Sequence, residues 1–192
     1  MKIAAIYGSV REKRQGIKAA RFIVNHLKNR GHEVTLIDPL EYRLPLLKKM
    51  YKSYKHGEAP EILEKLHKIM INSDAYVIVS GEYNHSIPPA LSNILSHFLE
   101  EYFFKPSAIV SYSAGRFGGV RAAMQLRAML AELGMPSIPS IFPIGKVQDS
   151  FDEQGNDITE KKDYEKRIEK FIKELEWYAE ALKEKRKSGI PY

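Results

Sequence analysis

The chain has 192 residues, 44% of them hydrophobic, which suits a single domain with one core over residues 1–192. It contains no cysteine, which excludes disulfides, thiolate metal sites and cysteine nucleophiles, and we expect a cytoplasmic protein. A balance of 30 basic against 24 acidic residues gives a net charge of +6, which suggests an anionic partner but does not separate phosphates from nucleic acids or acidic metabolites.

Five short apolar runs along the chain predict buried strands. The first run follows Met1 and stops at Gly8, so it is too short for a signal peptide or a membrane span. No other segment suggests a membrane partner. The predicted strands cover residues 3–7, 34–37, 75–79, 108–111 and 138–144.

Between and after these runs, apolar residues recur at the spacing of amphipathic helices. Gly31 ends the first predicted helix, and Pro88 and Pro89 begin the third, where proline costs little because the first amides of a helix have no partner within it. The predicted helices lie within residues 17–27, 62–70, 88–98, 120–133 and 161–187.

Strands that alternate with helices predict an α/β fold, a doubly wound parallel sheet of five strands with helices on both faces. Ligands of such sheets bind beyond the carboxyl ends of the strands. This rule selects three loops before any motif is considered: the first loop (residues 8–16), the second loop (81–87) and the third loop (113–119).

The last predicted helix is long and carries apolar residues spaced alternately by four and three, from Tyr164 to Leu182. This spacing is that of a coiled-coil seam. We favour packing of the stripe on the sheet of its own domain, because amphipathic helices usually face the core. The alternative is a contact between subunits.

The first loop leaves a strand and enters a helix, which is where a phosphate binds readily. The helix would offer free amides and the positive end of its dipole, Ser9 a hydroxyl, and Arg11 and Arg14 charged donors. The loop matches neither GxGxxG nor GxxxxGK[ST], so it fits a mononucleotide phosphate better than a dinucleotide. The alternative is an ordinary loop with its arginines in water.

The second and third loops suit a flat heteroaromatic ligand. Tyr83 can shield a ring, while Asn84 and Ser86 can bond its polar edge. The three glycines of the third loop would allow close backbone approach to the same ligand, unless it is simply a mobile surface loop. The six histidines show no spacing typical of a metal site, and we expect none. Asp38, before Pro39, is interpreted as a turn former.

These motifs together resemble the NADPH-dependent FMN reductases of the flavodoxin-like superfamily, which include quinone, azo-dye and chromate reductases. Residues 8–11 (GSVR) resemble that family's GSxR loop, and residues 82–88 (EYNHSIP) resemble its PEYNxSxP loop. Residues 113–119 are followed at 121–127 by a sequence similar to its RAxxQLR. Residues 177–182 resemble the closing helix of its members.

The resemblance implies a flavodoxin-like strand order of 2-1-3-4-5 and FMN as the cofactor. It implies that hydride passes from NADPH or NADH to flavin N5 and that electrons then pass, with ping-pong kinetics, to a small acceptor: a quinone, free flavin, azo dye or metal oxyanion. No side chain would be catalytic, and the subunits would form a homodimer or homotetramer. The implied FMN contacts are Ser9, Arg11, Arg14, Gly16, Ile17, Glu82, Tyr83, Asn84, Ser86, Ser113, Gly115, Gly118 and Gly119.

Two other functions remain open at this point. A flavodoxin-type electron carrier would bind FMN without oxidising nicotinamide directly, but such carriers are usually acidic and this chain is basic. A nucleic-acid-binding module would explain the charge, yet the sequence has no helix-turn-helix, aromatic RNA-binding strand pair or zinc pattern, so we expect no nucleic-acid partner.

Overall fold

The computed structural model describes residues 1–192 and contains one sheet of five parallel strands. The strands are ordered β2-β1-β3-β4-β5, as the flavodoxin-like topology requires. Their bounds extend the predicted ones by up to two residues at an end: β1 Lys2–Tyr7, β2 Glu33–Ile37, β3 Ala75–Gly81, β4 Ser107–Tyr112 and β5 Ser137–Ile144. The predicted strands and fold class are therefore confirmed.

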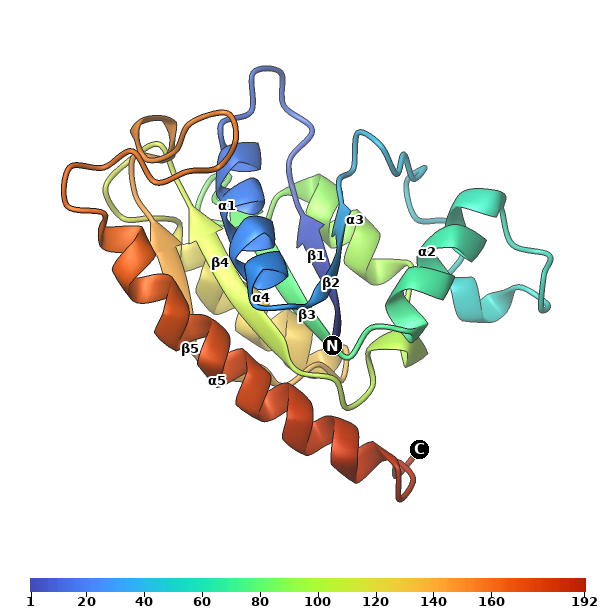
Figure 1. The fold of residues 1–192 in the computed structure, drawn as a ribbon. Coiled ribbons are helices and arrows are strands. Elements are labelled where there is room, and N and C mark those ends of the chain that lie inside the picture. Colours follow the sequence, from blue (N-terminus) through green and yellow to red (C-terminus); the bar gives the residue numbers. More distant parts are fainter.

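Helices cover both faces of this sheet (Figure 1). Side chains of α1 and α5 form one hydrophobic cluster with the sheet, and those of α2, α3 and α4 form a second cluster on the opposite face. No helix is long and apolar enough to cross a membrane. The helices are α1 Gly16–Asn29, α2 Glu61–Ile71, α3 Pro89–Ser96, α4 Val120–Glu132 and α5 Asp163–Arg186.

The strands divide their side chains between the two clusters with a period of two, as a sheet covered on both sides requires. In β3, Val77 packs toward α1 and α5, whereas Tyr76 and Ile78 pack toward the other helices. Both faces are apolar, which explains why the predicted strands are continuous apolar runs. The register between β1 and β3 places Tyr7 beside Val79, so both strands end at the same edge.

The apolar stripe of α5 packs on the sheet of its own chain. Ile168, Phe171 and Leu175 are buried in the cluster shared with α1, and Phe171 lies 5.3 Å from the Phe142 ring of β5. The preferred interpretation of this stripe is thus confirmed, and the stripe is not available to another subunit. Trp177, on another side of α5, stays 66% exposed.

Candidate functional site

A cavity of about 260 Å³ lies at the carboxyl ends of β1, β3 and β4, where the three selected loops meet. A fourth segment, the turn after β5, contributes Val147 and Gln148, which sequence reasoning missed. The predicted residues that line this cavity are Ser9, Arg11, Arg14, Gly16, Glu82, Tyr83 and Ser113. The predicted residues that do not line it are Ile17, Asn84, Ser86, Gly115, Gly118 and Gly119.

The first loop presents backbone donors that no group of the protein uses. Helix α1 begins at Gly16 without a side-chain cap, and the amide of Arg11 alone in this stretch has a partner, the Ser9 hydroxyl at 3.4 Å. An anion at a helix N-terminus satisfies such amides and the positive end of the dipole. The amides without a hydrogen-bond acceptor in the chain are those of Ser9, Val10, Glu12, Lys13, Arg14, Gln15, Gly16 and Ile17.

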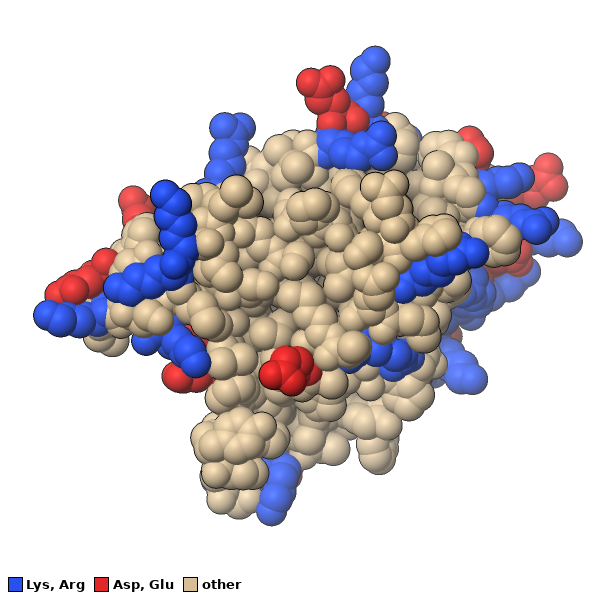
Figure 2. All heavy atoms as spheres, turned by 180° about the vertical axis from the view of Figure 1, so that it is seen from behind, with Lys and Arg blue, Asp and Glu red and all other residues tan.

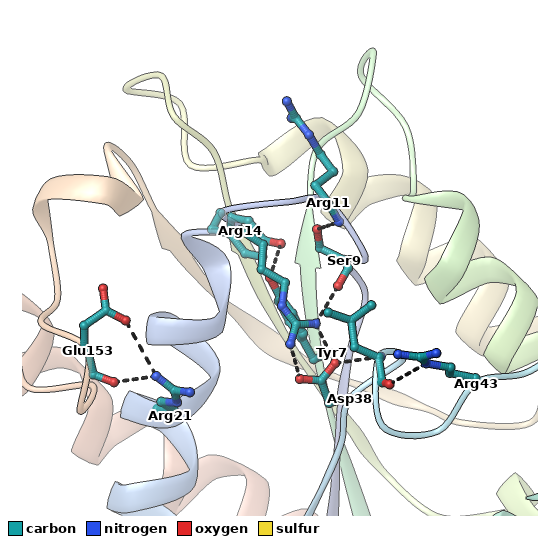
Figure 3. A network of polar contacts seen from close by, with 10 residues as sticks. Tyr7, Ser9, Arg11, Arg14, Arg21, Asp38, Arg43 and Glu153 are labelled. Atoms are coloured by element: carbon teal, nitrogen blue, oxygen red, sulfur yellow. Dashed lines mark hydrogen bonds and ion pairs between the residues drawn. The ribbon is translucent and has the colours of Figure 1, made fainter.

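Ser9 joins the first loop to the second. Its buried hydroxyl lies 2.7 Å from the phenol oxygen of Tyr83. The guanidinium of Arg11 lies 5.5 Å from the centre of the Tyr83 ring and has no acidic partner. Figure 3 shows it pointing away from the sheet, opposite to Arg14. Arg11 is therefore free to meet an anion at the cavity.

Arg14 is held by a buried carboxylate. Its two terminal nitrogens donate to the two Asp38 oxygens, each at 2.5 Å, and one also donates to the carbonyl of Ser9 at 2.9 Å (Figure 3). The guanidinium lies 5.2 Å from the centre of the Tyr7 ring. Asp38 is 3% exposed, so this ion pair is largely removed from water. Arg14 thus fixes the course of the first loop through Asp38.

The turn role predicted for Asp38 is confirmed, because its carboxylate accepts from the amide of Leu40 at 2.9 Å. Its pairing with Arg14 was missed. The signal was available in the strand order, since β2 lies beside β1 and the carboxyl end of β2 therefore borders the first loop.

Gly16 and Gly81 leave space for the ring of Tyr112, which lines the cavity. A Cβ on Gly16 would lie 2.1 Å from the Tyr112 ring, and one on Gly81 would lie 3.1 Å from it. The Tyr112 hydroxyl donates to that of Tyr7 at 3.3 Å, and burial raises its pKa well above the ordinary value, so it stays neutral. Packing against Tyr112 therefore requires glycine at position 16.

The second loop contains a tight two-residue hairpin. Tyr83 and Ser86 exchange two backbone hydrogen bonds, of 3.0 and 2.9 Å, across Asn84 and His85, whose φ angles are 51° and 62°. Positive φ at both central residues is the geometry of a type I′ turn. The turn places Tyr83 in the cavity and leaves Asn84 exposed, while Ser86 donates to Gln125 of α4 at 2.7 Å.

Glu82 connects the second loop to α4. Its carboxylate accepts from the amides of Arg121 and Ala122 at 3.0 and 3.3 Å, in the first turn of that helix. A carboxylate there satisfies free amides and interacts favourably with the helix dipole. Glu82 therefore positions the second loop relative to α4, although it also lines the cavity.

The glycines of the third loop serve two purposes. Gly118 and Gly119 have φ angles of 64° and 74°, and a Cβ on Gly119 would lie 2.7 Å from the carbonyl oxygen of Tyr112. They allow the chain to turn tightly from β4 into α4. Gly115 has open space around it and accepts from the Ser113 hydroxyl at 2.9 Å.

The residues of the cavity fit FMN. Free amides and the guanidinium of Arg11 match the phosphate, and the aromatic Tyr83 offers an apolar surface to a ring. Comparison with known proteins agrees with this fit. Residues 1–149 match the family described as NADPH-dependent FMN reductase. The chain belongs to this family.

Two relatives illustrate what members of the family are named for. An NADPH azoreductase from Bacillus sp. (strain OY1-2) is 26% identical over 188 residues, 97% of either protein. A quinone reductase from Pseudomonas putida is 30% identical over 161 residues, 80% of this chain and 82% of that protein. The chain is thus an oxidoreductase that uses FMN and NAD(P)H, in a family whose members act on small molecules such as quinones and azo dyes.

Solved structures show the same fold. FerB, a flavoenzyme NAD(P)H:(acceptor) oxidoreductase from Paracoccus denitrificans, superposes with a TM-score of 0.72 at 21% identity, over 95% of this chain and 97% of that one. A flavodoxin mutant from Pseudomonas aeruginosa gives 0.59 at 17% identity, over 92% and 99% of the two chains. The flavodoxin-like fold expected from the sequence is therefore confirmed.

Proposed function

We propose that FMN binds in the cavity with its phosphate at the first loop and its ring beside Tyr83. The eight amides without acceptors, together with the unpaired guanidinium of Arg11, are the observation that carries this proposal. The proposed phosphate contacts are Ser9, Arg11, Arg14 and Gly16 in the cavity lining and Ile17 outside it. The proposed ring contacts are Glu82, Tyr83 and Ser113 in the lining and Asn84, Ser86, Gly115, Gly118 and Gly119 outside it. Because Arg14 is already paired with Asp38, we expect Arg11 to contribute more.

FMN held there would supply hydride transfer from NAD(P)H and electron transfer to an acceptor, which we propose is a quinone, free flavin, azo dye or metal oxyanion. The protein positions the reactants and needs no general acid or base of its own. Because one cavity is bordered by all three loops, we propose that the nicotinamide and the acceptor use it in turn. That order gives ping-pong kinetics, with parallel lines in a double-reciprocal plot.

The proposed homodimer or homotetramer is supported by the face of the molecule that α3 and α4 cover. Helix α3 contains no charged residue, and Met124 of α4 is 51% exposed. Figure 2 shows this side, where charged side chains lie mostly around the edge of a broad uncharged area. Such surfaces are typical of protein contacts. Light scattering of the purified protein tests the assembly.

Two further proposals rest on packing and composition. Both hydrophobic clusters share one sheet, which supports a single domain over residues 1–192.

The absence of cysteine means that nothing in the chain requires an oxidising compartment, which supports a cytoplasmic location.

The test of the function is a visible spectrum of the protein loaded with FMN and then given NADPH without oxygen. We expect the bound flavin to bleach and to regain its colour when a quinone is added. Bound flavin that stays yellow would contradict nicotinamide oxidation and favour the electron carrier. Failure to bind FMN would contradict the proposed site itself.

A further inference from the structure

Tyr112 stands at the carboxyl end of β4 and lines the cavity, although sequence reasoning missed it. It is buried, with 7% of its surface exposed. Its ring lies 6.2 Å from the ring of Tyr7 at the end of β1 and packs against Gly81 at the end of β3. The side chain of Tyr112 therefore reaches from the start of the third loop toward the first loop.

The Tyr112 hydroxyl lies beside the first turn of α1, where the helix has unused amides. A Cβ on Gly16, the first residue of the helix, would lie 2.4 Å from the hydroxyl oxygen. The hydroxyl thus fills the space that a side chain at position 16 would take. The Cβ and the amide nitrogen of one residue are two bonds apart, so the hydroxyl oxygen lies within about 5 Å of the Gly16 nitrogen.

The residues directly before α1 turn their side chains to other groups of the protein. Gln15 donates to the carbonyl of Lys13 at 3.1 Å, and Arg14 is paired with Asp38. No side chain caps the helix. The hydroxyl of Tyr112 is therefore a donor that a different element, β4, supplies to the start of α1.

The hydroxyl of Tyr112 can turn toward a ligand. It donates to the hydroxyl of Tyr7 at 3.3 Å, whereas about 2.8 Å is usual between two hydroxyls. A hydroxyl has one proton and two lone pairs, so Tyr112 can accept from Tyr7 and donate to an anion instead. Burial raises the pKa of both phenols, so both keep their protons at neutral pH. The two hydroxyls therefore offer a donor without a negative charge that would repel an anion.

We propose that the hydroxyl of Tyr112 donates a hydrogen bond to the phosphate of FMN and makes the site select FMN over riboflavin. One phosphate oxygen that accepts from the Gly16 amide at about 2.9 Å and from the hydroxyl at about 2.7 Å can bridge the two donors. Riboflavin has no phosphate and cannot use this donor. This inference rests on the proposed function, because it assumes that the phosphate of FMN binds at the first loop.

The test is the affinity of Tyr112→Phe for FMN and for riboflavin, measured by quenching of flavin fluorescence. This variant keeps the ring that packs against Gly16 and Gly81 and removes only the hydroxyl. We expect FMN to bind about tenfold more weakly, as loss of a hydrogen bond to a charged group does, and riboflavin to bind as before. Riboflavin thereby reports any change in the packing of the cavity.

Tyr76→Phe is the matched control. Tyr76 is also a buried tyrosine of the sheet, but its hydroxyl donates to the carbonyls of Met70 and Glu101, at 2.7 and 2.8 Å, on the opposite face. Its loss should leave the affinity for both flavins unchanged. Tyr7→Phe is a second variant, which keeps the proposed donor and should weaken FMN binding less than Tyr112→Phe does.

Three results would overturn the inference. Equal weakening of FMN and riboflavin in Tyr112→Phe would mean that the residue acts through packing. Unchanged affinity for FMN in that variant would mean that its hydroxyl does not meet the phosphate. A larger loss of FMN affinity in Tyr7→Phe would assign the donor to Tyr7. Failure of the unaltered protein to bind either flavin would instead contradict the proposed function.

Discussion

The two ends of the sheet differ in whether their polar groups have hydrogen-bond partners within the chain. At the amino end, the buried ammonium of Lys105 donates to the carbonyls of Met70 and Ile71, at 3.0 and 2.8 Å, where α2 ends. Asp74 accepts from the amide of Lys2 at 2.9 Å and pairs with Lys183 at 3.0 Å. Each of these groups has a partner within the chain, as the interior of a stable protein requires.

At the carboxyl end, the first loop leaves eight amides and the guanidinium of Arg11 without a protein acceptor. The structure has no buried side-chain nitrogen or oxygen without a partner, whereas the unused donors at this end are backbone amides and the exposed guanidinium of Arg11. The difference supports the proposed binding of FMN at the carboxyl end. Donors without acceptors, more than any single motif, indicate where the cofactor belongs.

The ion pair between Arg14 and Asp38 lies at the carboxyl end of the sheet. Like the polar groups of the amino end, both of its members have partners within the chain, and Asp38 is buried. Arg14 also donates to the carbonyl of Ser9 and so holds the loop that carries the open amides. The comparison therefore predicts that this pair stabilises the loop, whereas Arg11 acts on the ligand.

The largest effect is expected from Arg14→Ala. It leaves Asp38 buried without its cation, which should lower the free energy of unfolding by about 3 kcal/mol. Urea denaturation at pH 7 measures this loss. FMN affinity should also fall, because the first loop loses the contact that fixes its course.

The double variant Arg14→Met/Asp38→Asn is the control for that prediction. It removes both charges and keeps the volume nearly constant, so we expect part of the stability to return. If Arg14→Ala changes stability by less than about 0.5 kcal/mol, which is usual for surface sites, the pair does not hold the loop.

A smaller effect is expected from Lys105 at the amino end. Burial lowers the pKa of Lys105 from 10.5 to about 8, so between these values the unfolded chain binds more protons than the folded one. Stability should therefore rise with pH, by about 2 kcal/mol between pH 8 and pH 10. Lys105→Met should flatten this rise in urea titrations at pH 8 and pH 10. An equal rise in the variant would assign it to other groups.

The sequence was sufficient to predict the strands, the helices and the loops of the site, because both faces of the sheet are apolar and the loops follow strands at one edge. It could not assign the side chains within those loops. The pairing of Arg14 with Asp38 depends on the course of a loop after β2, and the absence of Ser86 from the cavity depends on a turn that directs it to Gln125.

The glycines also show that the sequence does not identify which neighbour a residue packs against. Sequence reasoning assigned Gly118 and Gly119 to close approach of a ligand, and the structure adds that the backbone of Tyr112 also leaves no room for a side chain at Gly119. Gly16 was expected at the phosphate, and the ring of Tyr112 also requires it to be glycine. A glycine in the sequence indicates a position where a side chain does not fit. Only the packed structure shows which neighbouring atoms exclude that side chain.

The smallest effect on stability is expected from Arg11→Ala, whose main effect should be on FMN affinity. The Arg11 side chain lies against the Tyr83 ring and forms no ion pair, so its loss should change stability by less than about 0.5 kcal/mol. It should weaken FMN binding about tenfold, which corresponds to one charge-assisted hydrogen bond to the phosphate, measured by fluorescence quenching of free flavin.

Arg21→Ala is the matched control, because Arg21 also follows the first loop but bonds the carbonyl of Glu153, away from the cavity (Figure 3). It should leave FMN affinity unchanged. Equal weakening in both variants would mean that overall charge attracts the cofactor. Weakening in Arg11→Ala alone, with riboflavin bound equally by both, would place the phosphate at Arg11 and assign the two arginines of the loop to different tasks: Arg14 to its shape and Arg11 to its ligand.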